Sequence, residues 1–149
     1  MVRSCLLTGF LAALCHPAYG AVFHDKITQI VGDNTLSLLH DVGDPTTVRF
    51  GIARDSESQA WKLDTLGFHD DEVVITPLNS SKTLVCEPGS KCRLDLEGSK
   101  QLYRITRVET EIFTFQDIVS SLYLSRAPDL DLKLTTATSD SIYFALAKI

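Results

Sequence analysis

Short runs of apolar residues alternate with polar ones along residues 21–149, and turn-forming residues separate the runs. Val, Ile, Leu, Phe, Tyr and Thr dominate the runs, and clusters of Gly, Pro, Asn, Asp and Ser lie between them. In 130–134, three leucines fall on one face of a strand, and Asp131 and Lys133 fall on the other. No stretch shows the 3.6-residue period of a long amphipathic helix. This pattern predicts an all-β protein.

Twelve of these runs are predicted to be strands, four in each of three consecutive segments. They cover residues 27–31, 35–40, 47–52, 60–66, 72–76, 83–86, 92–96, 102–108, 111–115, 121–125, 130–135 and 141–146. Short strands with turn signals about every ten residues favour a closed barrel or a sandwich. Since no linker interrupts them, we expect a single domain over 21–149.

The strand pattern also repeats along the chain. Residues 72–108 match residues 112–148 at a constant offset of forty positions, and an earlier copy ends at Trp61. The matched pairs include two leucines, two prolines and two tyrosines: Leu84 and Leu124, Pro88 and Pro128, Tyr103 and Tyr143. A fixed period of this kind decides the architecture. The alternative is a chance alignment of alternating apolar residues. The prolines and aromatics favour three pseudo-symmetric repeats, approximately 27–68, 69–109 and 110–149.

Residues 1–20 are predicted to be a secretory signal peptide outside the fold. Arg3 supplies a positive start, a short apolar run follows, and small residues flank a cut before Ala21. The run is shorter than the roughly 20 apolar residues that span a bilayer, so we expect no membrane anchor. The alternative is a buried N-terminal helix.

Charge and cysteine content agree with a secreted, extracellular protein. Removing Arg3 from the whole-chain balance of −5 leaves about −6, a mild acidic excess that argues against nucleic acid as the main partner. Cys86 and Cys92 are the two cysteines left after residue 20, and we expect one disulfide between them. So short a loop contributes about 2 kcal/mol to stability. Asn79 opens the sequon Asn79-Ser80-Ser81, which predicts glycosylation on a surface loop.

Each repeat ends in a glutamine-x-aromatic triplet or its relic. The three triplets are Gln59-Ala60-Trp61, Gln101-Leu102-Tyr103 and Ser141-Ile142-Tyr143. With four strands per repeat, the chain resembles the β-trefoil fold, and in particular the ricin-B-type lectin family with its repeated Q-x-W motif. The resemblance covers essentially all of 21–149. It implies that the three aromatic residues of the triplets are buried in the core.

In ricin-B-type lectins a repeat builds a sugar site from an aspartate after its second strand, an aromatic platform on its third, and polar groups near the glutamine. Carboxylates and amides hold sugar hydroxyls there, and the ring covers the apolar face of the sugar. The resemblance implies a carbohydrate-binding site in the first repeat, formed by Asp41, Asp44, Asp55 and Gln59. Its platform position holds Arg49. At the corresponding places the second repeat carries Glu87, Arg93 and Lys100. The third repeat carries Ala127 or Asp129, Lys133 and Asp140.

We therefore expect a secreted, non-catalytic, carbohydrate-binding protein with glycans or glycoproteins as partners. Metalloprotease, nucleophile-elbow and phosphate-loop motifs are absent from the sequence, so no enzyme, cofactor or metal site is expected. His69-Asp70-Asp71 fits an acidic solvated loop better than a set of metal ligands. The alternative is a secreted β-trefoil protease inhibitor that inserts the rigid loop between Cys86 and Cys92, with Pro88 and Lys91, into a protease cleft. A third class is a module that binds a protein partner.

Overall fold

The computed structural model describes residues 22–65, 69–136 and 139–149, and these residues form twelve strands and two single-turn 3-10 helices. The predicted signal peptide lies outside the described residues. In chain order the elements are β1 (Val22–Val31), β2 (Asn34–His40), β3 (Val48–Ile52), η2 (Glu57–Gln59), β4 (Trp61–Asp64), β5 (Glu72–Pro77), β6 (Thr83–Val85), β7 (Arg93–Asp95), β8 (Tyr103–Glu109), β9 (Ile112–Asp117), β10 (Tyr123–Arg126), β11 (Leu132–Thr135), η3 (Asp140–Ile142) and β12 (Ala145–Lys148). Every strand overlaps its predicted range, which confirms the all-β prediction. No helix in the described ranges is long and apolar enough to cross a membrane.

Six of the strands close into a barrel, formed by the first and fourth strands of each repeat. β1 pairs with β4, β4 with β5, β5 with β8, and β8 with β9, all antiparallel. β12 pairs with β1 on one side. On its other side, Phe144 and Phe113 exchange two backbone hydrogen bonds just before β12 begins, and these join it to β9. Closure leaves the barrel without a free strand edge.

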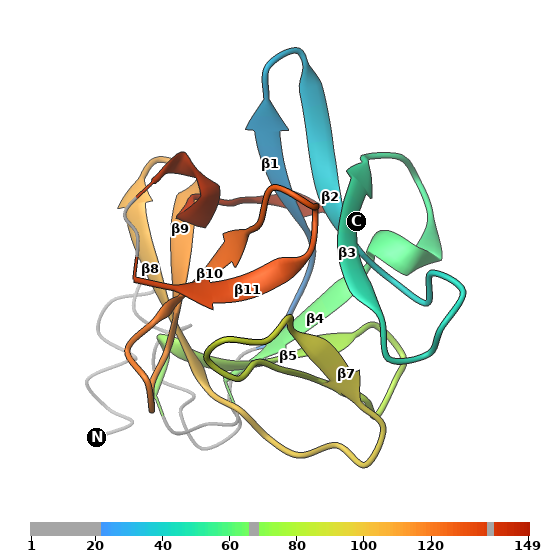
Figure 1. The fold of residues 1–149 in the computed structure, drawn as a ribbon, viewed down its shortest axis with the longest axis vertical. Helices are drawn as coiled ribbons and strands as arrows, with labels where there is room; N and C mark the ends of the chain where they lie inside the picture. The colour runs from blue at the N-terminus through green and yellow to red at the C-terminus, as the bar shows by residue number, and fades with distance from the viewer. Residues whose placement is uncertain (1–21, 66–68, 137–138) are drawn as a thin grey trace, which may run out of the picture.

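The remaining strands form three hairpins, β2–β3, β6–β7 and β10–β11, that bond to one another. Figure 1 shows β3, β7 and β11 around the centre of the view. Three backbone hydrogen bonds join each hairpin to the other two: Phe50 N donates to Leu130 O, Cys92 N to Leu132 O, and Leu94 N to Thr46 O. The three hairpins therefore make a pseudo-threefold cap, and the predicted three repeats correspond to real structural units.

Equivalent positions of the repeats fill the core. The second strands contribute Leu38, Leu84 and Leu124, and the third strands contribute Phe50, Leu94 and Leu134, all of them buried. Trp61 and Tyr103 begin the fourth strands and are fully buried. Each of these two rings also satisfies a second-strand carbonyl, since Trp61 Nε1 donates to Leu38 O at 2.9 Å and Tyr103 Oη donates to Leu84 O at 3.2 Å.

In the third repeat the predicted core aromatic is wrong by one residue. Tyr143 is 36% exposed, whereas Phe144 is 1% exposed and packs between Phe50 and Phe115. Phe144 lies 41 residues after Tyr103, so the forty-residue offset fails between Leu134 and the last strand. Side chains alternate between the two faces of an extended chain, and one extra residue therefore turns the neighbouring side chain inward.

The same extra residue shifts the alignment of the last repeat, so the predicted bounds of its final strand are also wrong. η3 corresponds to η2, so the buried Ile142, and not Ser141, stands where the first repeat has Gln59. β12 begins at Ala145, four residues later than the predicted start of the strand. The third Q-x-aromatic relic is thus Ile142-Tyr143-Phe144. An apolar side chain has replaced the glutamine amide there.

Candidate functional site

A groove of about 770 Å³ lies in the first repeat, beside the end of β2 and the loop that contains η2. The residues that matter for its chemistry are Lys26, Asp41, Asp55, Ser56, Ser58 and Asn79, and Leu78 and Ile149 add apolar surface. Asp41 and Asp55, two of the four sugar-site residues implied by the resemblance, both line it. Glu57 also lines it, so the groove combines three carboxylates with amine, hydroxyl and amide groups.

Asp41 follows β2 directly and adopts the left-handed conformation, with φ of 58°. Short polar residues tolerate this conformation. Its carboxylate accepts a hydrogen bond from Lys82 Nζ at 3.0 Å and lies 3.2 Å from His40 Nδ1. The bond from Lys82 lowers the pKa of Asp41 against the opposing effect of burial, and His40 lowers it further. Asp41 is thus an ionised hydrogen-bond acceptor at neutral pH.

Asp55 is a second ionised acceptor in the groove, on the loop between β3 and β4. Lys26 Nζ, from β1, donates to its Oδ1 at 2.8 Å and lowers the pKa of Asp55. Its side chain is fully exposed. Each carboxylate therefore has one fixed lysine partner and further oxygen lone pairs open to a ligand.

Asp44 and Gln59 do not line the groove. Oδ1 of Asp44 accepts from the backbone N and the hydroxyl of Thr46, which folds an exposed turn. Gln59 is fully buried, with its Oε1 accepting from Arg54 N at 2.9 Å and its Nε2 donating to Ile52 O at 3.0 Å. These two bonds hold the start of the loop that carries Asp55. Gln59 is thus placed to support this loop and has no free amide group for a ligand.

Sequence reasoning missed the residues that hold Asp41 in place. Lys82 lies 41 residues from Asp41, and only the fold brings the two together. His40 is buried at the groove wall, where its Nε2 lies 3.0 Å from Ala60 O and its ring meets Trp61 edge-on. No Trp, Tyr or Phe is among the described residues that line the groove. Arg49, at the expected platform position, belongs to the hairpin cap.

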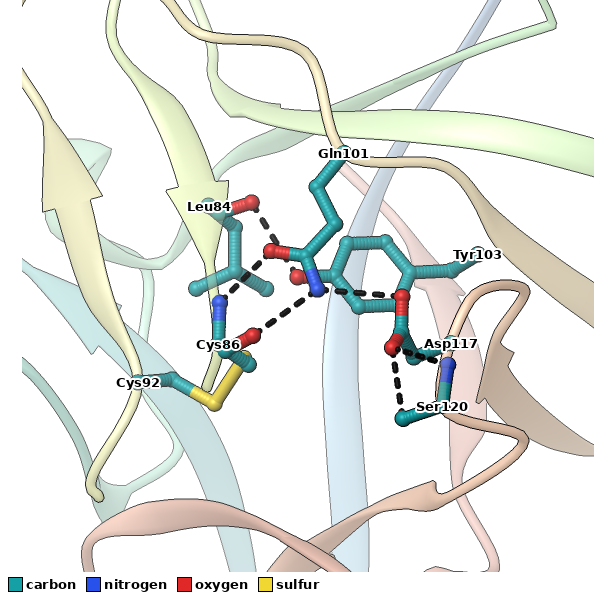
Figure 2. Close-up of a disulfide and its surroundings, with 7 residues drawn as sticks. All are labelled: Leu84, Cys86, Cys92, Gln101, Tyr103, Asp117 and Ser120. Atoms are coloured by element: carbon teal, nitrogen blue, oxygen red, sulfur yellow. Dashed lines mark hydrogen bonds between the residues drawn. A yellow bond between two sulfur atoms is a disulfide. The ribbon is translucent and has the colours of Figure 1, made fainter. Parts of the chain in front are cut away.

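The predicted disulfide joins Cys86 and Cys92 next to a second glutamine amide (Figure 2). Gln101 Oε1 accepts from Cys86 N at 2.7 Å, and its Nε2 donates to Cys86 O at 2.9 Å and to Asp117 Oδ1 at 3.0 Å. Residues 87–91 between the cysteines are exposed. The loop favoured by the protease-inhibitor alternative is therefore pinned at its base by a covalent bond and by a side-chain clip.

Asp117 makes this clip sensitive to pH. It is 3% exposed and accepts hydrogen bonds from the Ser120 backbone N and hydroxyl. Burial raises the pKa of Asp117, but the bonds from Ser120 and Gln101 outweigh it and bring the pKa below the ordinary value of an aspartate. Since the folded-state pKa is depressed, the stabilisation is present above pH about 4 and is lost as pH falls through the folded-state pKa.

We expect Asp117→Asn to lower the free energy of unfolding by about 1–3 kcal/mol at pH 7 and by less at pH 3, because the amide cannot accept from all three donors. Urea titrations at both pH values, followed by circular dichroism, measure this. Asp33→Asn, in the exposed turn between β1 and β2, is the matched control. An equal loss at both pH values would show that the carboxylate charge is not what Asp117 contributes.

No protein-family profile and no curated protein sequence matches this chain. Solved structures do match it. A designed threefold-symmetric protein, ThreeFoil, shares 13% identity and a TM-score of 0.68, over 85% of this chain and 99% of its own. The protein SeviL, bound to the asialo-GM1 saccharide, shares 16% identity and a TM-score of 0.67, over 86% and 98%. A ricin B-like lectin from Macrolepiota procera, in complex with lactose, shares 12% identity and a TM-score of 0.68, over 85% of this chain and 95% of its own.

The chain is a β-trefoil. This confirms the fold expected from the repeats, and the six-stranded barrel and hairpin cap are its two halves. At 12–16% identity the likeness concerns the fold, and the chemistry of this trefoil rests on its own residues. The trefoil core uses Gln59 and Gln101 differently: Gln59 clips the chain after β3, and Gln101 clips the chain after β6.

Proposed function

We propose that this β-trefoil is a secreted, non-catalytic carbohydrate-binding protein whose sugar site is the first-repeat groove. The observation that carries the proposal is the convergence of Asp41 and Asp55 on one groove, each ionised and each oriented by a lysine. Oriented carboxylates accept hydrogen bonds from adjacent sugar hydroxyls in pairs. Two of the structurally similar proteins bind saccharides, which supports the same class of ligand.

The other groove residues complement a sugar. Lys26 donates hydrogen bonds, and the hydroxyls of Ser56 and Ser58 both donate and accept them. Leu78 gives an apolar surface for the C–H face of the ring. Because no aromatic ring among the described residues covers that face, we expect weak binding to single sugars, with a Kd of about 1 mM. Multivalent presentation of the glycan would raise the apparent affinity.

Secretion is part of the same proposal. The Cys86–Cys92 disulfide is of the kind that persists in oxidising compartments. Asn79 is exposed in a tight turn with φ of 61°, so its sequon is accessible to glycosylation. Residues 1–20 have the composition of a cleaved signal peptide. These observations support an extracellular protein whose partners are glycans or glycoproteins.

A glycan array followed by titration calorimetry with the best ligand tests this function. We expect Asp41→Asn/Asp55→Asn to weaken binding about tenfold or more, since both lysine-oriented carboxylates of the groove are lost and only Glu57 keeps its charge. Asp33→Asn/Asp44→Asn removes the same charge outside the groove and should leave the Kd unchanged. Equal Kd values for both double variants would place the sugar elsewhere. An empty array together with tight inhibition across a protease panel would favour the inhibitor alternative.

A further inference from the structure

The outward side of the hairpin cap carries a second set of polar residues, hereafter the cap face. Along β3, β7 and β11 and the residues just before them, every second side chain points inward and is buried, including Phe50, Cys92, Leu94 and Leu132. The alternate side chains point outward. They form the cap face: Thr47, Arg49, Lys91, Arg93, Asp131 and Lys133.

The pseudo-threefold axis brings these six residues together in pairs. Isolated antiparallel bridges place Arg49 opposite Asp131, Thr47 opposite Arg93, and Lys91 opposite Lys133. Side chains opposed in this way have Cβ atoms about 4.5–5.5 Å apart, and like charges in such pairs repel. Four cations and one carboxylate therefore share one face of a chain whose net charge is −5.

The cations of the cap face have carboxylates nearby but make few direct bonds with them. Within the described part of the chain, the side chains of Arg49, Lys91 and Arg93 make no hydrogen bond and no ion pair. Lys133 Nζ lies 4.0 Å from Asp129.

Two further carboxylates lie near the rim of the cap face. Asp44 is engaged with Thr46, and Asp95 accepts from the backbone N–H groups of Glu97 and Ser99. These rim carboxylates reduce the positive potential but leave the guanidinium and ammonium donors free.

We propose that the cap face is a second binding site, for the sulfate esters of an acidic glycan. Arg49 and Arg93 present forked donors that match the oxygens of a sulfate ester, and an anion between Lys91 and Lys133 would relieve their repulsion. Thr47 and Asp131 on the same face can bond sugar hydroxyls. The face carries no apolar side chain that could insert into a membrane, which favours a glycan over a lipid surface.

The equivalence of the repeats strengthens this assignment. Arg49, Arg93 and Lys133 each precede the inward third-strand residue of their repeat, and all three are basic. The residues that oppose them in the bridges, Thr47, Asp131 and Lys91, differ in chemical type. All three repeats thus place a positive charge at the position where the hairpins meet. This site lies outside the first-repeat groove and does not depend on its function.

The test is titration calorimetry with a sulfated heparin tetrasaccharide and its desulfated counterpart, at low and high NaCl. We expect the sulfated chain to bind about tenfold or more tightly than the desulfated chain, and binding to weaken with salt. Arg49→Gln/Lys91→Gln/Arg93→Gln should reduce this affinity about tenfold or more. Lys62→Gln/Lys100→Gln/Arg107→Gln makes the same charge change outside the cap face, and Asp41→Asn/Asp55→Asn alters only the groove. Both should stay within about threefold of the parent.

Several outcomes would overturn the cap-face site. An equal loss in the two triple variants would mean that binding follows net charge alone. Absence of binding at low salt would remove the site, and tighter binding of a phosphomannose oligosaccharide would remove the assignment to sulfate. Vesicles containing phosphatidylserine that bind when the sulfated glycan does not would point to a membrane surface. Because the groove variant is tested in parallel, failure of the cap face is distinguishable from failure of the proposed sugar site.

Discussion

Phe144→Ala should lower the free energy of unfolding by about 3–5 kcal/mol, whereas Tyr143→Ala should change it by about 0.5 kcal/mol or less. Phe144 is buried between Phe50 and Phe115, with ring centroids 6.1 and 5.7 Å away. Removal of its ring leaves a cavity beside the bonds that join Phe144 to Phe113 and close the barrel. Urea denaturation of the two variants, followed by circular dichroism, measures both free energies.

This pair of variants separates two alignments of the third repeat. If the forty-residue offset continued to the end of the chain, Tyr143 would be the core residue and its replacement would be the costly one. Phe144→Leu serves as a control, because it keeps an apolar side chain at the site and should cost less than alanine. Similar losses for Phe144→Ala and Tyr143→Ala would contradict the one-residue shift.

Trp61→Ala should be about as destabilising, by about 3–5 kcal/mol. The indole is fully buried, and its Nε1 donates to Leu38 O, which would lose its partner. Trp61→Phe keeps most of the apolar volume and loses the hydrogen bond, so we expect a smaller loss of about 1–3 kcal/mol. Chemical denaturation of the two variants and the parent gives the comparison.

Trp61 also links the core to the first-repeat groove. Its ring packs edge-on against His40, with centroids 4.9 Å apart, and His40 lies within hydrogen-bond distance of Asp41. At a temperature where the alanine variant is still folded, we expect it to bind the best array glycan several-fold more weakly than Trp61→Phe does. Equal affinities in the two variants would show that His40 and Asp41 keep their positions without the indole.

The hydrogen-bond partners of Gln59 and Gln101 could not be predicted from the sequence motif that both residues share. Both precede a buried aromatic by two residues, and both bond backbone groups through the amide oxygen and the amide nitrogen. Gln59 ends a 3-10 turn and reaches the end of β3, whereas Gln101 lies outside any helix or strand and reaches Cys86. The partner of such an amide depends on which unpaired backbone groups the neighbouring loop leaves within reach.

By itself the sequence determined the features that depend on short stretches of chain. Alternation specifies which side of a strand is apolar, so the all-β class, the twelve strands and most core residues followed from it. The forty-residue period predicted the threefold arrangement, and two cysteines close in sequence predicted their disulfide. Even here the prediction of the third core aromatic was wrong. One extra residue after Leu134 makes Phe144, and not Tyr143, the buried side chain, because a single insertion turns every following side chain of a strand to the opposite face.

Only the tertiary structure decided which polar residues meet. Lys82 of the second repeat bonds Asp41 of the first, 41 residues away. Lys26 on β1 bonds Asp55 on the loop between β3 and β4, 29 residues away. Arg49, Arg93 and Lys133 share a face because three hairpins bond around one axis. The pattern of apolar positions records burial, which every strand specifies locally. The neighbours of an exposed polar side chain depend on how the barrel and cap close, and no local stretch of sequence contains that information.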